Sequence, residues 1–168
     1  MIIKNLTKNL YISLLIVFLV YALDRISKTY IIYLDKINNG SDIFLSSYLN
    51  ISLIWNKGIA FGLFSFEKSH FYNVLSTAIA FVILILITMA VKNTGFKRYS
   101  LLIIIGGALG NLFDRVFFSA VPDFIDFHIG EFHWFIFNVS DIFITLGVIG
   151  MIILELIDKD KNYDDKKI

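Results

Sequence analysis

The sequence predicts an all-α membrane protein with four transmembrane helices and a small β-containing loop outside the lipid. Of its 168 residues, 57% are hydrophobic and only 17% are charged. A soluble domain of this length could not bury so much apolar surface, so the bilayer is the expected solvent. The single proline and the seventeen phenylalanines agree with this class, because lipid-facing helices avoid breakers and accept large apolar side chains.

Four apolar segments are long enough to cross a bilayer. The run Phe71–Val91 holds no charge, and at the helical rise it covers roughly 30 Å, the thickness of the hydrocarbon core. The first segment follows two lysines, as a signal peptide would, but no small-residue cleavage site comes after it, so we expect it to remain as a helix. The predicted spans are about 10–33, 71–91, 99–118 and 138–157.

The basic residues predict that both termini are cytoplasmic. With four spans the two ends share one side, and most lysines fall on that side, as the positive-inside rule requires. The loops Leu34–His70 and Ser119–Phe137 then face outward, and Tyr48–Ile54 in the first loop is prone to form a strand. The stretch 158–168 mixes charges without apolar residues and is expected to be a disordered tail of a single domain, 1–168.

Charge and cysteine content exclude several classes of function. The formal net charge of +1 offers no basic excess to meet phosphates, so a nucleic-acid partner is not expected. Because the chain has no cysteine, it can form no disulfide, thiolate metal site or cysteine nucleophile. Membrane lipids are the partners that the composition itself implies.

Polar residues recur in one pattern on the third and fourth segments. Asn111, Asp114 and Arg115 fall on one helical face, and Asn138 and Asp141 repeat the Asn-x-x-Asp spacing. Since the chain leaves the membrane after the third helix and re-enters at the fourth, the two motifs lie at similar depth. This symmetry alone nominates Asp114 and Asp141 as a pair.

Such residues permit both a structural and a chemical interpretation. Intramembrane aspartates can join helices by hydrogen bonds, and Asp114 beside Arg115 looks like a self-satisfied pair. Gly106 and Gly110 have the small-xxx-small spacing of a close helix contact. Two carboxylates in one low-dielectric pocket, however, cannot both ionise cheaply, so they provide an acid and a base. With a bound water, such a pair can hydrolyse an amide without a metal or a covalent nucleophile.

A metal site in the second outer loop is a weaker hypothesis. His128 and His133, together with Asp126 and Glu131, could supply oxygen and nitrogen ligands to a divalent ion. Their spacing matches no strong metal template. The prediction is therefore that no metal is bound and that these are interfacial polar residues exposed to water.

An ion pathway is the alternative function. The intramembrane charges could form a relay through a small proton- or ion-coupled transporter, the candidates being Asp24, Lys28, Asp114, Arg115 and Asp141. Alternating access usually needs two matched halves, and the chain shows no internal inverted repeat. The transporter is therefore kept as the alternative.

Five sequence blocks together carry a resemblance to a known family. They are Asp24-Arg-Ile-Ser-Lys28, Asn56-Lys-Gly-Ile-Ala-Phe-Gly62, Gly106-Gly-Ala-Leu-Gly-Asn-Leu-Phe-Asp-Arg115, Val121-Pro-Asp-Phe-Ile125 and Phe137-Asn-Val-Ser-Asp141. Each block alone is weak, but all five in this order relative to four spans are specific. The chain resembles signal peptidase II, the bacterial lipoprotein signal peptidase, over essentially its full length.

The resemblance implies a function, a place and a set of residues. It implies a monomeric aspartyl endopeptidase of the bacterial cytoplasmic (inner) membrane, without a cofactor, whose active site faces the outer leaflet. Its substrates would be lipid-modified prolipoproteins, cut before the diacylglyceryl-modified cysteine. The resemblance makes Asp123 and Asp141 catalytic, which overrules the pairing of Asp114 with Asp141. The supporting residues would be Asp24, Lys28, Asn56, Gly58, Asn111, Asp114, Arg115 and Asn138.

The sequence departs from the family pattern without losing a carboxylate. The family usually has Gly at Ser119, Val at Pro122, and small residues at Ser140 and Ile142. Pro122 removes a backbone donor beside Asp123 and stiffens the approach of the chain to it. We expect this departure to affect the geometry of the bound substrate or the rate of cleavage.

Overall fold

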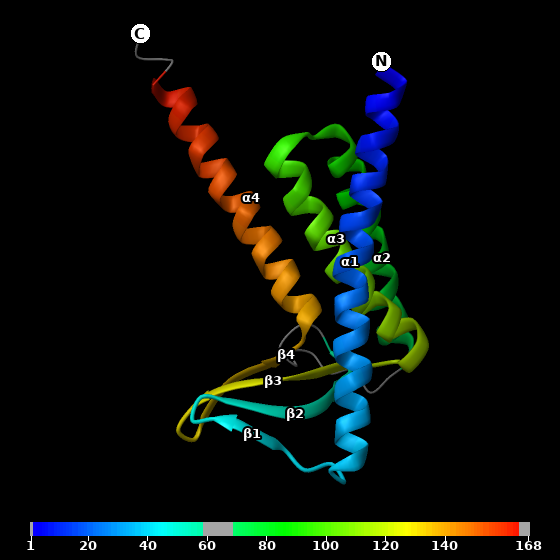
Figure 1. Ribbon diagram of the computed structural model, residues 1–168, viewed down its shortest axis with the longest axis vertical. Coiled ribbons are helices and arrows are strands. Elements are labelled where there is room, and N and C mark those ends of the chain that lie inside the picture. The colour runs from blue at the N-terminus through cyan, green and yellow to red at the C-terminus, as the bar shows by residue number, and fades with distance from the viewer. Residues whose placement is uncertain (1, 59–68, 165–168) are drawn as a thin grey trace.

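Four long helices form the greater part of the chain (Figure 1). The computed structural model describes residues 2–58 and 69–164, and within them the side chains of 9–58 and 73–157. Every one of the four contains a stretch long and apolar enough to cross a membrane, which confirms the prediction of four such helices. The helices are α1 (Ile2–Ile37), α2 (Ser69–Lys92), α3 (Gly95–Phe118) and α4 (Val139–Asp164).

A four-stranded antiparallel sheet lies at one end of the helices. Its strands are in chain order β1 (Ile43–Ser46), β2 (Leu49–Asn56), β3 (Val121–Ile129) and β4 (Phe132–Phe137). The first two strands confirm the β-containing loop expected after the first helix. The other two are not among the predicted elements, because the second outer loop is short and its aromatic residues suit a membrane surface as well as a strand.

The helix ends differ from the predicted ones. α1 extends beyond the predicted 10–33 in both directions, and α4 continues to Asp164, so residues 158–164 are helical where a disordered tail was expected. Elongation of an existing helix adds one hydrogen bond per residue, which favours such continuation past the lipid. Residues 165–168, and residues 59–62 of the second motif block, lie outside the described residues.

α3 is the central helix and packs against the other three. In the apolar stretch of α3, 56% is buried inside the structure, against 11–17% in the other three helices. Most of the surface of those three helices is therefore left for contact with lipid. A Cβ on Gly106 would lie 2.7 Å from Val20 of α1, and one on Gly107 would lie 2.7 Å from the carbonyl oxygen of Ser140 near the start of α4. The expected close contact of this glycine-rich face is confirmed, and it involves α1 and α4 together.

Candidate active site

Asp123 and Asp141 meet where the sheet joins the helix bundle. Asp123 lies on β3, shortly after the end of α3 at Phe118, where Ser119 turns the chain with a positive φ of 55°. Asp141 lies in the first turn of α4. Both side chains line one cavity of about 280 Å³, whose other walls are Asn56, Ile79, Ala108, Asn111, Arg115, Val121, Asn138, Ile144 and Thr145.

Asn138 and Asp141 close the start of α4 with a reciprocal pair of hydrogen bonds. The backbone N–H of Asp141 donates to Asn138 Oδ1 at 3.1 Å, and the backbone N–H of Asn138 donates to Asp141 Oδ2 at 3.1 Å. This is the capping-box arrangement, in which the N-cap and the third helical residue satisfy each other's backbone donors. A third donor at this end, the N–H of Ser140, is accepted by Asp24 Oδ1 of α1 at 3.0 Å.

Three asparagine side chains direct their NH₂ groups at the two carboxylates. Asn56 and Asn138 donate to the two oxygens of Asp123 at 2.8 and 2.6 Å. Asn111 donates to Asp141 Oδ1 at 2.9 Å. Each carboxylate thus accepts from a fixed amide, and Asp141 also accepts the backbone N–H of Asn138.

The oxygen of each amide is held by a donor of its own. Asn56 Oδ1 accepts the backbone N–H of Gly58 at 2.8 Å, and Asn111 Oδ1 accepts from Lys28 Nζ at 2.7 Å. The Asn138 oxygen accepts from the Asp141 backbone, as described above. An amide whose oxygen is bound in this way can present only its NH₂ group to the carboxylate.

Four buried or partly buried charges join α1 to α3. Lys28 Nζ lies 2.9 Å from Asp24 and 2.7 Å from Asp114. Arg25 lies 2.7 Å from Asp24 and 2.5 Å from Asp114. Two cations and two anions therefore cancel within the bundle, which is the condition under which lipid tolerates them. Through Lys28 and Asn111 this cluster also orients the donor to Asp141.

The expected pairing of Asp114 with Arg115 is wrong. Asp114 is held by the two cations of α1, whereas Arg115 Nη2 donates to the carbonyl oxygen of Gly58 at 3.0 Å and Nη1 donates to that of Asn111 at 3.3 Å. Neighbours in a helix point in directions about 100° apart, and here Asp114 is directed at α1 whereas Arg115 is directed at Gly58. Arg115 instead fixes the segment that follows β2.

Burial and the neighbouring Asp141 carboxylate raise the pKa of Asp123 to about 6, although the amides of Asn56 and Asn138 act in the opposite direction. Asp123 is 4% exposed, so its charged form loses most of its hydration. The side chain therefore retains a proton in conditions where an exposed aspartate would have lost it.

All the residues expected at the site lie in one network, and one member was not foreseen. Arg25 stands inside the first motif block, yet the sequence analysis gave it no role. The signal was present, since an arginine within an apolar helix needs an acidic partner. Two such partners, Asp24 and Asp114, are in place.

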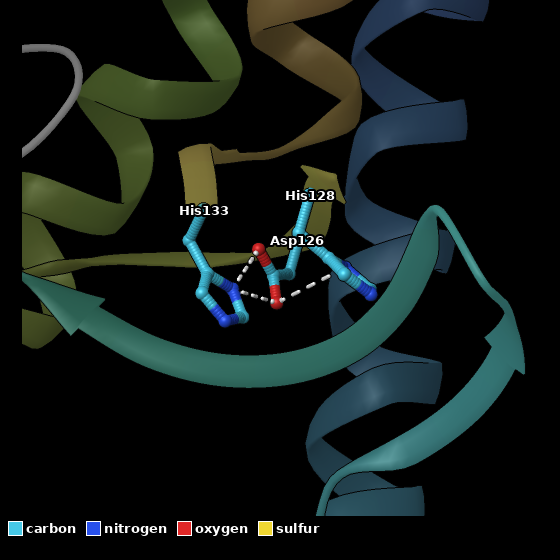
Figure 2. A group of neighbouring side chains, drawn as sticks. All are labelled: Asp126, His128 and His133. Atoms are coloured by element: carbon cyan, nitrogen blue, oxygen red, sulfur yellow. Dashed lines mark hydrogen bonds and ion pairs between the residues drawn. The ribbon is translucent and has the colours of Figure 1, made fainter. Parts of the chain in front are cut away.

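The residues considered for a metal form a separate group. Figure 2 shows His133 and His128 on either side of the Asp126 carboxylate, and the possible ligand atoms of the three lie within 4.8 Å of one another. Glu131, at the turn between β3 and β4, is outside the group. The expectation of exposed interfacial residues is wrong for Asp126 and His128, which are 3% and 8% exposed.

Comparison with known proteins identifies the family. The family model described as Signal peptidase (SPase) II matches residues 16–157. The lipoprotein signal peptidase of Pelagibacter ubique (strain HTCC1062) is 47% identical, covering 95% of this chain and 96% of its own length. That of Anaplasma phagocytophilum (strain HZ) is 44% identical, covering 86% and 92%.

Solved structures agree with this relationship. A bacterial membrane enzyme determined by the in meso method at 2.3 Å resolution has a TM-score of 0.72 to this chain and 31% sequence identity, covering 89% of this chain and 90% of that chain. A second such structure, at 1.9 Å, has a TM-score of 0.68 at the same identity. The chain therefore belongs to the signal peptidase II family of aspartic peptidases.

Proposed function

We propose that the chain removes signal peptides from prolipoproteins and that Asp123 and Asp141 perform the hydrolysis. The observation that carries the assignment is the placement of two carboxylates in one cavity, each held by amide donors of fixed direction. The curated relatives are lipoprotein signal peptidases over nearly the whole chain. Of the two cations in the transporter alternative, Lys28 is paired with Asp24 and Asp114, and Arg115 donates to two backbone carbonyl oxygens.

The two carboxylates have different surroundings, which support different roles for them. Asp141 lies at the N-terminus of α4, where a backbone N–H and the helix dipole favour an anion. Asp123 carries the proton, because burial and the Asp141 charge both oppose its ionisation. In this arrangement Asp141 is the base and Asp123 is the acid.

Hydrolysis then proceeds without a covalent intermediate. Asp141 takes a proton from a water molecule, whose oxygen adds to the scissile carbonyl carbon while Asp123 gives its proton to the carbonyl oxygen. The resulting tetrahedral diol collapses as Asp141 passes its proton to the leaving nitrogen and Asp123 recovers one from a hydroxyl. The C–N bond breaks, and both carboxyl groups return to their starting states.

An apolar groove beside the dyad suits a lipid-linked substrate. It has a volume of about 460 Å³ and reaches Asp141, and its other lining residues are Phe127, Trp134, Phe135, Phe137, Ile142, Thr145 and Leu146. Such a groove can receive a hydrophobic segment from the bilayer while the scissile bond reaches the carboxylates. We place the enzyme in the bacterial inner membrane with both termini cytoplasmic, its dyad at the outer leaflet and its cut before the lipidated cysteine.

A synthetic lipidated precursor tests the assignment directly. Asp123→Asn and Asp141→Asn should each reduce cleavage by at least about a thousandfold, since an amide can serve neither as acid nor as base. Glu131→Gln is the matched control, because Glu131 is an exposed acid at the turn between β3 and β4 and lies outside the cavity. Asp114→Asn should reduce cleavage only in part. Full activity of either dyad variant, or equal loss in the Glu131 control, would contradict the proposal.

A further inference from the structure

A second cluster of ionisable groups lies on the other face of the sheet from Asp123. Side chains alternate along a strand, so Asp126 and His128 share one face of β3, while Asp123 points to the opposite one. Phe127, between them, is part of the groove at Asp141. The cluster of Asp126, His128 and His133 is therefore separated from the dyad by the sheet, and the proposed hydrolysis does not use it.

An irregularity in β4 brings His133 into this cluster. Phe127 pairs with Phe135, but the next residue of β3, His128, pairs with His133. Trp134 is thus an extra residue in β4, which makes this a β-bulge. In a regular ladder His128 would face Trp134, and His133 would point to the other side of the sheet. Bulges commonly re-aim side chains in this way.

The three side chains converge at ligand distances of one another. His133 Nδ1 lies 2.8 and 3.0 Å from the two oxygens of Asp126, and His128 Nδ1 lies 3.8 Å from Asp126 Oδ2 (Figure 2). The two imidazole rings are stacked, with centroids 5.1 Å apart. Two ligands of one zinc ion, each about 2 Å from it, are about 3.3 Å apart in a tetrahedral site, so small rotations suffice.

Two buried polar atoms in this region have no hydrogen-bond partner. His128 is 8% exposed, and its Nδ1, directed at the Asp126 carboxylate, is one of them. The other is Asn50 Oδ1 on β2, whose residue pairs directly with Asp126 across the strands. Buried polar atoms are normally satisfied, and an unpaired one costs roughly 1–3 kcal/mol. A metal ion bound here would be coordinated by His128 Nδ1, and Asn50 Oδ1 can supply a further ligand.

We propose that Asp126, His128 and His133 bind a divalent transition metal ion, of which Zn²⁺ is the best-matched example. Two imidazole nitrogens and one carboxylate oxygen are a common ligand set for this ion, and the fourth position remains for Asn50 or water. The side chain of His133 is 54% exposed, which gives the ion an entry path and lets this ring move off the carboxylate. The bound ion would hold β3, β4 and the bulge in one arrangement.

This metal would act on the fold of the sheet rather than on the peptide bond. The site and the dyad share β3 but occupy opposite faces, so the ion cannot reach a substrate held at Asp141. It would instead fix the strand that carries Asp123 and the hairpin that walls the apolar groove. The proposal is independent of the proposed function and is tested by binding, not by cleavage.

Calorimetric titration with ZnCl₂ tests the site on the full chain, purified in detergent without a histidine tag and stripped with a chelator. Wild type should bind one ion per chain and gain thermal stability on binding. His128→Gln and His133→Gln should each weaken binding by at least about tenfold. His133 is half exposed, so its variant should fold even if the His128 variant does not.

Two control variants show where any ion is held. Glu131→Gln removes an acid from the same hairpin but outside the cluster, and Asp141→Asn removes a carboxylate of the dyad; both should bind as wild type does. Wild-type titration indistinguishable from that of His133→Gln would overturn the proposal and leave a hydrogen-bonded Asp–His pair. Loss of binding in Asp141→Asn would also overturn it, because the ion would then lie at the dyad.

Discussion

The asparagines around the dyad combine two tasks that can be separated experimentally. Asn138 caps α4 through its oxygen and donates to Asp123 through its nitrogen. Asn56 and Asn111 likewise use the oxygen for architecture and the nitrogen for a carboxylate. A side chain that has an acceptor oxygen but no NH₂ group would therefore still cap α4 but could not donate to Asp123.

The substitution Asn138→Ser separates helix capping from donation to Asp123. Serine caps helices about as well as asparagine, so Asn138→Ser should preserve the melting temperature, whereas Asn138→Ala should cost about 1 kcal/mol of stability. Both variants lose the amide donor to Asp123, and we expect cleavage of a lipidated precursor to fall at least about tenfold in each. Paired thermal unfolding and cleavage assays check this. Wild-type activity in Asn138→Ser would show that the donor to Asp123 is dispensable.

The raised pKa of Asp123 predicts a pH dependence with a definite sign. Its pKa is about 6 in the folded protein against 3.8 for the ordinary group, so between these values the folded state binds more protons than the unfolded state. The free energy of unfolding should therefore fall as pH rises through this window. Asp123→Asn should lack this contribution.

Thermal unfolding at a series of pH values measures the effect, with Glu131→Gln, at an exposed acid, as the matched control. The cleavage rate of wild type should also decline as pH rises above about 6, because the acid loses its proton. A wild-type stability profile that coincides with that of Asp123→Asn would contradict the assignment of the raised pKa to Asp123.

Among the elements, α3 depends most on small residues. A Cβ on Gly110 would lie 2.5 Å from both Asp24 Oδ2 and Ser140 Oγ, so it would push on α1 and α4 at once. Gly110→Ala should therefore destabilise the protein by about 1–3 kcal/mol and reduce cleavage, as overpacking of a tight contact does. Val116 on the same helix is 63% exposed, so Val116→Ala should change neither stability nor cleavage. Thermal unfolding and cleavage assays test this prediction. If Gly110→Ala changes neither stability nor cleavage, the helices must be able to move apart at little cost.

How well each element could be predicted depended on the length of its pattern. The spans follow from long apolar runs, which only a bilayer can accommodate, and α2 was placed within two residues at its start. The β3–β4 hairpin was missed because alternation is short there and aromatic residues have two explanations at a membrane surface. The bulge at Trp134 depends on cross-strand register, which no local sequence signal specifies.

The site itself was predictable only in part. Asp141 emerged from helical spacing, whereas Asp123 entered through the family resemblance, because its approach to Asp141 depends on where β3 begins. The symmetry between the two Asn-x-x-Asp motifs favoured Asp114, yet this side chain is occupied by Arg25 and Lys28. Only the packing of α1 against α3 shows that Asp114 is paired and that Asp141 is not held in this way. Such a contact between helices cannot be predicted from one segment alone.

At the scale of the whole molecule, the sheet lies at the end of the helices opposite the α2–α3 connection (Figure 1). The absence of cysteine makes the predicted orientation simple to test with single replacements at two exposed positions, Ser47 beside the sheet and Thr94 before α3. In intact cells an impermeant maleimide should label Ser47→Cys but not Thr94→Cys. Thr94→Cys should react once the membrane is opened, and the reverse pattern would invert the topology.

The charge cluster between α1 and α3 also has a consequence for biogenesis. α1 contributes one anion and two cations to this cluster, and the fourth member, Asp114, is synthesised only later, as part of α3. Until then α1 holds an uncompensated positive charge that lipid penalises. We therefore expect α1 to be held stably only once α3 has inserted, and a chain truncated before α3 to be degraded faster than the full chain. Stable placement of α1 thus precedes completion of the site, because Asp123 and Asp141 are synthesised after α3.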